Sequence, residues 1–454
     1  MIQNEQKIMQ LFINLLEEQK YDRIKEILGR YQPADIAEIL GNMDVDDAER
    51  GEIFKLLDKG AAALVLDMLD IGTITSLLNA LGPQYIAEIL NEMSSDDAAD
   101  LLGHFPEELR NTLLGLMQAE DAGEVQELLE YDIESAGGIM TTEYVAIPKD
   151  ITAGRAIEIL RKTAPDAETI YYVYVVDSQN RLVGVISLRE LIVADPNTLI
   201  ENIMHRKVIS VSVDMDQEEV AEVVSKYDFL AVPVVDKDSR LVGIITVDDI
   251  IDVIYEEAAE DIFRLGGSTD LVDDYVEARI SRALKSRLPW LFVTMLEGII
   301  AGQVLHGLEN ELRAVVALAF FIPLLTGMGG NVGTQSATVT VRGLATGDID
   351  ENNVFSVISR ELLTGVLLGV INGVLVGSIA WVWQKNAVLG LIVGLAMIGN
   401  MTTAALMGAL VPLTFKKVGI DPAVASAPFI TASIDITGLL IYSTLASLFI
   451  GFLL

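Results

Sequence analysis

The pattern of hydrophobic and polar positions changes abruptly near residue 287. Beyond that point five long apolar runs follow one another, at 288–305, 314–340, 361–384, 387–414 and 426–454. A helix that crosses a membrane needs about 20 mostly apolar residues, so we predict five membrane-spanning helices. Eight Lys and Arg residues flank the ends expected inside and two flank the ends expected outside. This bias predicts a cytoplasmic N-terminus and a C-terminus outside the cell membrane.

The first 133 residues show a shorter helical pattern that repeats. Residues 33–48 (PADIAEILGNMDVDDA) and 83–98 (PQYIAEILNEMSSDDA) match at ten of sixteen positions at an offset of fifty. A fixed period of this kind is typical of stacked helices, and we predict an all-α helical-repeat N-domain at 1–133. Each copy ends on an Asp-Asp pair, at Asp46 and Asp47 and at Asp96 and Asp97. These carboxylates either favour the positive end of a helix or bind cations.

Residues 134–251 contain a second repeat, of β-branched strands. Residues 173–187 (VYVVDSQNRLVGVIS) align with 232–246 (VPVVDKDSRLVGIIT), and each strand pair follows a helical stretch. This α/β pattern resembles a tandem pair of CBS modules, which dimerise and often bind ATP or another adenosine nucleotide. The resemblance implies that phosphate and ribose contacts would fall on Ser187, Glu190, Thr246 and Asp249.

An acidic segment follows, and we predict a connecting helix at 252–281 before a transmembrane domain at 282–454. Within 246–265 the apolar residues recur at helical spacing beside an acidic stripe of Asp249, Asp252, Glu256 and Glu260. Such a helix is either a solvated face or is neutralised by cations or a basic partner. The basic residues just before the first span are typical of a cytoplasmic membrane boundary; they are Arg279, Arg282, Lys285 and Arg287.

Charge is distributed unevenly along the chain. The 454 residues carry a formal net charge of −35, and residues 287–454 hold 9 acids and 7 bases, net −2. The first 286 residues therefore hold 57 acids and 24 bases, net −33 (66 − 9 and 31 − 7). This acidity argues against a nucleic-acid partner and suits a domain that handles cations. There is no cysteine, which excludes disulfides and thiolate metal sites, and no nucleophile–base constellation indicates an enzyme.

One acid lies inside the last apolar run. Asp435 is the only charged residue of 426–454, and on a helix it shares a face with Thr431, Gly438 and Tyr442. A charge at this depth costs about 2.5–3.5 kcal/mol on insertion scales. Asp435 is therefore either a structural residue satisfied by a neighbouring helix or a cation-binding residue in a pathway. We favour the second interpretation.

The second run carries the other polar face. Pro323 precedes a glycine-rich stretch, and the two features together predict a bent or broken helix. Asn331, Gln335 and Thr338 fall on one face with Gly327 and Thr334. Small residues alone would indicate close packing, whereas the amides and hydroxyls favour a pore lining. Other polar side chains in the runs include Glu297, Asn372 and Asn400. Glu297 is either structural or lies at an entrance, and both interpretations stay open.

The order of these parts resembles the MgtE family of magnesium channels. The motifs that carry the resemblance are Gly329-Gly330-Asn331-x-Gly333-x-Gln335-Ser336 and Asp421-Pro422…Asp435-x-Thr437-Gly438. The resemblance implies a homodimer in the membrane lipid, with Asp435 selecting the ion and Asn331 lining the pore beside Thr431 and Gln335. It also implies that internal Mg²⁺ closes the channel by bridging acids, which with Asp421 would be Glu218, Asp228, Asp248, Asp249, Asp252, Glu257, Glu260 and Asp261.

The residues fit this implication chemically. Mg²⁺ prefers oxygen ligands and dehydrates reluctantly, so one carboxylate per subunit beside hydroxyls and carbonyls suits a hydrated ion. We therefore expect a Mg²⁺-selective channel gated by cytoplasmic Mg²⁺. The alternatives are a less selective divalent transporter for Mn²⁺ or Co²⁺, and a membrane-tethered nucleotide sensor that transports nothing.

Overall fold

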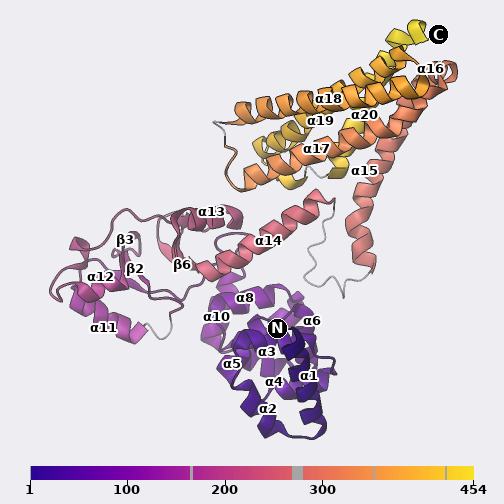
Figure 1. Cartoon of the computed structure of the whole chain (residues 1–454). Helices are drawn as coiled ribbons and strands as arrows, with labels where there is room; N and C mark the ends of the chain where they lie inside the picture. Colours follow the sequence, from indigo (N-terminus) through magenta and orange to yellow (C-terminus); the bar gives the residue numbers. More distant parts are fainter. Residues whose placement is uncertain (1, 164–166, 268–279, 351–352, 425–426, 454) are drawn as a thin grey trace. The chain divides into compact units, whose positions relative to one another are not determined.

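A computed structural model describes residues 2–163, 167–267, 280–350, 353–424 and 427–453 (Figure 1). The chain separates into two compact units, Met1–Glu256 and Glu257–Leu454. The first unit contains a helical part and an α/β part, and the second contains the long apolar helices. Each unit is described by itself below.

The first part of unit 1 is built from ten short helices. They are α1 (Ile2–Glu17), α2 (Tyr21–Leu28), α3 (Pro33–Asn42), α4 (Asp47–Phe54), α5 (Lys59–Asp67), α6 (Ile71–Leu81), α7 (Pro83–Leu90), α8 (Ser95–Gly103), α9 (Glu107–Leu114) and α10 (Ala119–Leu128). The two sequence repeats become α3–α4 and α7–α8. Helices α3, α5, α7 and α9 pack on one another in order, while α4 packs on α6 and α8 on α10. The predicted helical array is confirmed.

Local chemistry explains where these helices begin. Pro33 and Pro83 occupy the first turn of α3 and α7, where a missing N–H costs nothing. Asp46 caps α4 and accepts a hydrogen bond of 2.8 Å from the backbone N–H of Glu49. In the second repeat the helix starts earlier, so Asp96 and Asp97 lie in the first turn of α8. Capping therefore accounts for Asp46 but not for its counterpart.

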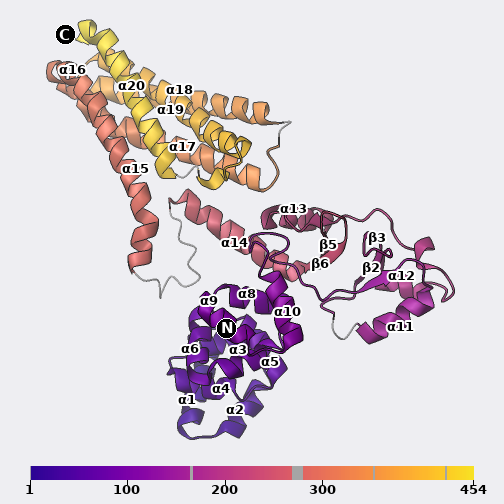
Figure 2. The same ribbon diagram turned by 180° about the vertical axis from the view of Figure 1, so that it is seen from behind.

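The second part of unit 1 contains two sheets of the same design. Their elements are β1 (Ala146–Pro148), α11 (Ala153–Thr163), β2 (Tyr172–Val176), β3 (Leu182–Ser187), α12 (Leu188–Val193), the 3-10 helix η2 (Ile200–Asn202), β4 (Val211–Ser212), α13 (Gln217–Tyr227), β5 (Ala231–Val235) and β6 (Leu241–Thr246). In each sheet the first two strands are parallel and the last two antiparallel, in the order β1-β2-β3 and β4-β5-β6. Figure 2 shows β2 and β3 of the first sheet and β5 and β6 of the second. The predicted tandem α/β repeat is confirmed.

The acidic helix predicted at 246–265 is α14 (Val247–Leu265), which begins directly after β6. Its first ten residues belong to unit 1 and the rest to unit 2. The connecting helix predicted at 252–281 thus starts earlier and reaches Leu265, and residues 268–279 lie outside the described residues.

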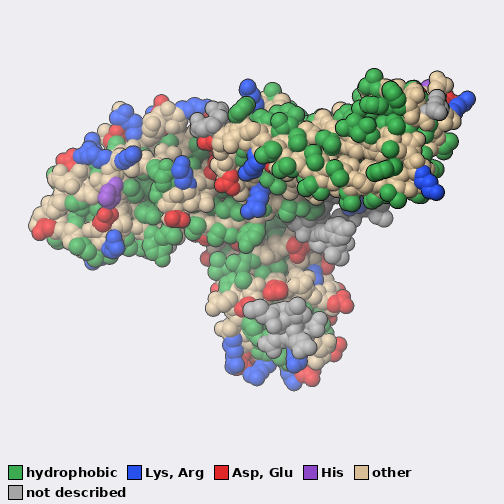
Figure 3. All heavy atoms as spheres, turned by 45° about the horizontal axis from the view of Figure 1, so that its top comes forward, with side chains coloured by type: hydrophobic (Ala, Val, Ile, Leu, Met, Phe, Trp, Pro, Cys, Tyr) green, Lys and Arg blue, Asp and Glu red, His purple; other side chains and the backbone are tan. Residues whose placement is uncertain are grey.

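Unit 2 contains the five predicted spans. Its elements are α15 (Ile280–Gly307), α16 (Glu309–Ala314), the 3-10 helix η3 (Val316–Phe321), α17 (Ile322–Ala345), α18 (Val354–Gln384), α19 (Ala387–Lys417), the 3-10 helix η4 (Pro422–Val424) and α20 (Ala427–Leu453). Within the part of unit 2 that the structure describes, five helices, with η3 joined to α17, are long and apolar enough to cross a membrane. Figure 3 shows many hydrophobic side chains on the face of this unit that is turned toward the viewer. The predicted fold class, a multi-domain integral membrane protein, is confirmed.

Helix α19 lies at the centre of unit 2 and packs against α17, α18 and α20. Its contact with α18 follows a row of glycines, Gly365, Gly369, Gly373 and Gly377. A Cβ atom placed on Gly373 would lie 2.6 Å from the carbonyl oxygen of Gly394. The two backbones therefore touch directly, which is the small-residue packing that membrane helices use.

The expected break in the second span is at a different position. Pro323 lies in the first turn of α17, where the chain changes from the 3-10 helix η3 to an α-helix. The glycine-rich stretch after it is continuous α-helix. Its glycines are tolerated because Gly329, Gly330 and Gly333 lie against neighbouring helices, which hold the backbone in place.

Candidate functional site

Helices α17 and α20 meet along the glycines of α17. Thr431 packs on Gly330, where an added Cβ would lie 2.9 Å from the Thr431 methyl carbon. One turn further along α20, the side chain of Ile434 packs on Gly333 of α17. These contacts place the next residue, Asp435, beside the face of α20 that packs on α17.

Asp435 has an unsatisfied carboxylate. Its side chain is half-buried, and its Oδ1 atom is buried without a hydrogen-bond partner among the described residues. Buried polar atoms in folded proteins nearly always have a partner, so such an atom needs an explanation. A cation, or the water that surrounds one, has the right chemistry to be that partner.

The polar face of α17 is open in the single chain. Asn331, Gln335 and Thr338 are exposed, whereas Gly329, Gly330, Gly333, Ser336 and Ala337 on other faces are buried. Nothing lies within 4 Å of an added Cβ at Gly327, which shares the polar face. A polar face that no described residue of unit 2 covers suits a water-filled path or a second subunit. Thr431 is thus placed against the glycine that precedes Asn331, while pore lining itself stays a prediction.

The predicted polar stripe of α20 is divided between two roles. Tyr442 is fully buried, and its hydroxyl donates a hydrogen bond of 2.8 Å to the carbonyl oxygen of Leu318. Gly438 lies against Asn400 of α19. Only Thr431 and Asp435 therefore remain available to an ion, because the later part of the stripe packs inside the unit. Glu297 of α15 lies close enough to Asp435 for their charges to interact.

Unit 1 brings acidic side chains from five segments together, which are α5, α8, α14 and the stretches around Glu143 and Glu168. Asp96 and Asp97 of α8 interact electrostatically with Asp248 and Asp249 of α14 and with Glu168. Asp96 is 5% exposed, and its Oδ1 atom has no hydrogen-bond partner among the described residues. Beside it, the backbone N–H of Ser95 donates to Glu143 at 3.2 Å, which holds α8 against the α/β part. We call this cluster of Asp67, Asp96, Asp97, Asp100, Glu143, Glu168, Asp248, Asp249, Asp252 and Glu256 the acidic surface.

The charges of the acidic surface repel one another. Burial, with the repulsion of Asp96 and Asp248, raises the pKa of Asp249 to about 8 despite the hydrogen bond from Thr246. Burial and Asp97 raise the pKa of Asp96 to about 6. Asp67, Asp100 and Glu168 keep contact with solvent, but the surrounding protein limits their hydration. This loss of hydration, and then neighbouring carboxylates, raise the pKa of each of the three to about 7.

Four of these acids were predicted on one helix and lie on α14: Asp248, Asp249, Asp252 and Glu256. The acids opposite them, Asp67, Asp100, Glu143 and Glu168, were not predicted, and Asp96 and Asp97 were left undecided. The signal in the sequence that could have indicated this surface was the repeated Asp-Asp pair, at Asp96 and Asp97. Among the described residues no three His, Asp or Glu side chains converge into a preformed metal-binding group. The acidic surface is therefore a set of facing charges rather than a coordination cage.

The remaining predicted metal ligands lie elsewhere. In unit 2 the guanidinium of Arg264 pairs with both Glu260 and Asp421. Burial, then Glu257, raises the pKa of Asp261. Glu218 and Asp228 lie at opposite ends of α13, in its first turn and at its C-cap.

The residues predicted to contact a nucleotide pair with one another. Ser187 and Glu190 form a capping box at α12, and the Thr246 hydroxyl donates to Asp249 at 2.6 Å. Glu190 also lies 2.8 Å from Nε2 of His205. These side chains lie outside the pocket that the two sheets enclose.

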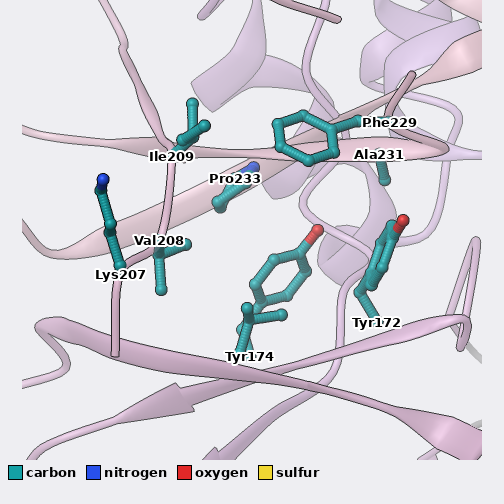
Figure 4. A pocket seen from close by; sticks show the side chains of 9 residues that line it. Tyr172, Tyr174, Lys207, Val208, Ile209, Phe229, Ala231 and Pro233 are labelled. Carbon is teal, nitrogen blue, oxygen red and sulfur yellow. The ribbon is translucent and has the colours of Figure 1, made fainter. Parts of the chain in front are cut away.

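That pocket, a cavity of about 110 Å³, lies between β2 and β5 (Figure 4). The rings of Tyr172, Tyr174 and Phe229 gather on one side, and Lys207 lies apart from them. Tyr174 is 1% exposed, and its hydroxyl is buried without a partner among the described residues. An apolar pocket with one unsatisfied hydroxyl and one cation at its edge suits a flat ring that carries phosphate.

Comparison with known proteins covers the same parts. Residues 322–445 match the MgtE family model, described as divalent cation transporter. Residues 31–134 match the MgtE intracellular N domain, and residues 136–197 and 200–256 match the CBS domain.

Curated relatives span both units. The magnesium transporter MgtE of Enterococcus faecalis is 48% identical over 334 residues, which cover 74% of this chain and 73% of the relative. The protein of the same name from Thermus thermophilus is 45% identical over 339 residues and covers 74% of each chain.

Two solved structures each resemble a little over half of this chain. One is the soluble part of a magnesium transporter, 42% identical, with a TM-score of 0.51 over 56% of this chain and 99% of that one. The other is the cytosolic domain of the Mg²⁺ channel MgtE in complex with ATP, 42% identical, with a TM-score of 0.50 over 53% and 98%. This chain therefore belongs to the MgtE family of divalent cation transporters, and it is a multi-pass membrane protein of that family rather than an enzyme.

Proposed function

We propose that the protein conducts Mg²⁺ across the cell membrane, along a path lined by α17 and α20. The observation that carries this proposal is the carboxylate of Asp435. It lies inside an apolar span, and one of its oxygens is buried without a hydrogen-bond partner among the residues that the structure describes. The neighbouring helix α17 exposes Asn331 and Gln335, whose side chains supply further oxygen atoms. The names of the curated relatives support Mg²⁺ as the ion.

The path is completed by a second copy of the chain. A polar face on a membrane helix is costly toward lipid, so the open face of α17 favours a partner across a two-fold axis. Two Asp435 carboxylates would then face one path. Hard oxygen ligands and a single acid per subunit suit an ion that keeps much of its water, as Mg²⁺ does. Transport of Mn²⁺ or Co²⁺ is the alternative outcome of the flux test.

The acidic surface supplies the regulation. Its carboxylates repel one another when they face each other, and divalent cations between them remove that repulsion. Mg²⁺ therefore selects the arrangement in which α8 and α14 are close, because its affinity for that arrangement is higher. Since α14 continues into unit 2, this selection can close the path from the cytoplasm. The topology that fits is a cytoplasmic N-terminus and an outer C-terminus.

Flux into proteoliposomes tests the conduction. The Asp435→Asn variant keeps the shape of the side chain but removes its charge, and we expect Mg²⁺ flux to fall by roughly tenfold or more. Asp348→Asn is the matched control, since Asp348 lies outside the spans and accepts a hydrogen bond of 2.9 Å from Thr346. Near-normal Mg²⁺ flux in a folded Asp435→Asn protein would contradict the proposed path. Equal flux of Mg²⁺, Mn²⁺ and Co²⁺ through the wild-type protein would contradict its selectivity for Mg²⁺.

Nucleotide binding is a second proposed activity, favoured by the pocket of Tyr172, Tyr174 and Phe229. The related cytosolic domain was solved in complex with ATP, and this pocket offers aromatic rings for a base and Lys207 for phosphate. A nucleotide sensor without transport would bind ATP but pass no ion, so the flux assay separates the two functions.

A further inference from the structure

The side chain of Asn400 of α19 lies against both α17 and α20. This side chain is 1% exposed, although it carries an amide inside an apolar span. Its Nδ2 atom donates a hydrogen bond of 2.6 Å to the carbonyl oxygen of Leu325 on α17. An amide in such a place is costly unless its position serves a purpose.

Two glycines make room for this amide. A Cβ at Gly329 of α17 would lie 2.4 Å from Nδ2 of Asn400, and a Cβ at Gly438 of α20 would lie 2.4 Å from its Oδ1. The amide is therefore held between two backbones, with one side against each. Rotating it by half a turn would put Oδ1 against the Leu325 carbonyl, oxygen against oxygen, so the hydrogen bond fixes its orientation.

The two contacts differ in kind. Toward α17 the amide makes a hydrogen bond, which ties α17 to α19. Toward α20 its Oδ1 atom has no hydrogen-bond partner among the described residues, and it meets the Gly438 backbone by contact alone. Asn400 thus anchors one helix and limits how closely the other approaches.

Both contacts lie next to the proposed ion path. Gly329 is next to Gly330, which packs on Thr431, and Gly438 is three residues from Asp435, which puts Asp435 on the same side of α20. The separation of the two helices decides how much room a hydrated ion has between them. We propose that Asn400 is a positioning residue that sets the spacing of α17 and α20, and through it the preference for Mg²⁺ over larger divalent ions. This inference rests on the proposed function.

A near-isosteric variant tests it. Asn400→Leu fills the same space but cannot donate to Leu325, so we expect the Mg²⁺ to Ca²⁺ flux ratio in proteoliposomes to fall by roughly threefold to tenfold. Asn372→Leu is the matched control. Asn372 is a partly buried amide on α18 that donates to Leu368 of its own helix at 2.9 Å, so it links no two helices. The control should leave the flux ratio unchanged.

A cross-link measures the spacing without transport. The chain has no cysteine, and the Cβ position of Gly330 lies 3.7 Å from the Thr431 Cβ. This is within the range of about 3.5–4.5 Å that a disulfide needs. The pair Gly330→Cys and Thr431→Cys should therefore cross-link readily, and more slowly when Asn400→Leu is added. Asn372→Leu should not change that rate.

The outcomes are distinct. A folded Asn400→Leu protein with unchanged flux ratio and cross-linking rate would overturn the inference and leave the proposed function standing. If that variant does not fold, Asn400→Asp is measured instead, since it keeps the size and loses the Nδ2 donor. If neither folds while Asn372→Leu does, Asn400 has a packing role only and the inference is overturned. Absence of Mg²⁺ flux through the wild-type protein would contradict the proposed function itself.

Discussion

Ser336 of α17 donates a hydrogen bond of 2.6 Å to the carboxylate of Glu361 on α18, and both side chains are buried. Ser336 is next in sequence to the exposed Gln335, so the bond joins the inner face of α17 to α18 while its polar face stays open. The acid thus has a local structural role that its position in the sequence did not reveal.

Removing the Glu361 carboxylate should destabilise unit 2. We expect Glu361→Ala to lower the free energy of unfolding by about 1–3 kcal/mol, because it leaves the Ser336 hydroxyl buried without a partner. Thermal unfolding of the detergent-solubilised protein measures this. Glu361→Gln keeps an acceptor and should cost less, and Glu309→Gln, an exposed acid paired with Arg313, should cost almost nothing. Equal melting temperatures for Glu361→Ala and wild type would contradict the assignment.

The glycine row of α18 predicts a second stability effect. Gly373→Ala places a methyl group where the Gly394 carbonyl oxygen is only 2.6 Å away, so α18 and α19 must separate. Overpacking of this kind costs about 1–3 kcal/mol. Gly451→Ala is the control, because nothing lies within 4 Å of its Cβ position. The test is the difference in melting temperature between the two variants, and a loss as large at Gly451 would argue against a backbone contact at Gly373.

The acidic surface should respond to pH and to Mg²⁺ in opposite ways. Asp96 and Asp249 have folded-state pKa values of about 6 and about 8, above the ordinary value of 3.8. Between the ordinary pKa of 3.8 and these raised values, the folded state therefore binds more protons than the unfolded state. Its stability is greatest at low pH and falls as the pH rises through 6 to 8.

In chelator, hydrogen exchange of α8 and α14 in the whole protein should accelerate from pH 6 to pH 8, beyond the intrinsic rate. Mg²⁺ added at pH 8 should slow it again, because cations replace the lost protons. Asp249→Asn should reduce the pH effect. Glu190→Gln is the control. Hydrogen bonds from His205 and Ser187 hold the pKa of Glu190 at about 2, so this variant should leave the pH effect on exchange unchanged. Protection that stays constant or increases with pH would contradict this prediction.

Nucleotide binding should depend on the ring pocket. Phe229→Ala removes a wall of the cavity and Tyr174→Phe removes its unpartnered hydroxyl, so both should weaken ATP binding measured by calorimetry. We expect roughly tenfold weakening for Phe229→Ala, as for the loss of one stacking ring. Tyr171→Phe is the control, since Tyr171 is 66% exposed and does not line the cavity. Unchanged binding in both pocket variants would place the nucleotide elsewhere.

Several features could be predicted because they depend only on local pattern. Apolar runs of sufficient length specify the five spans, since lipid leaves few alternatives to a helix. The repeats at offsets of fifty and 59 specify the helical array and the paired sheets. Asp435 was conspicuous for the same reason, as the only charge in an apolar run of 29 residues.

Other features depend on which helices meet, and only the tertiary structure decided them. Capping explains Asp46, whereas Asp96, its counterpart in the repeat, faces α14 because the second helix starts earlier. Asn400 and Asn372 are the same residue type at similar depth, but one joins two helices and the other bonds within its own. Spacing along one helix fixes which residues share a face, while the identity of the neighbour comes from packing between segments far apart in sequence.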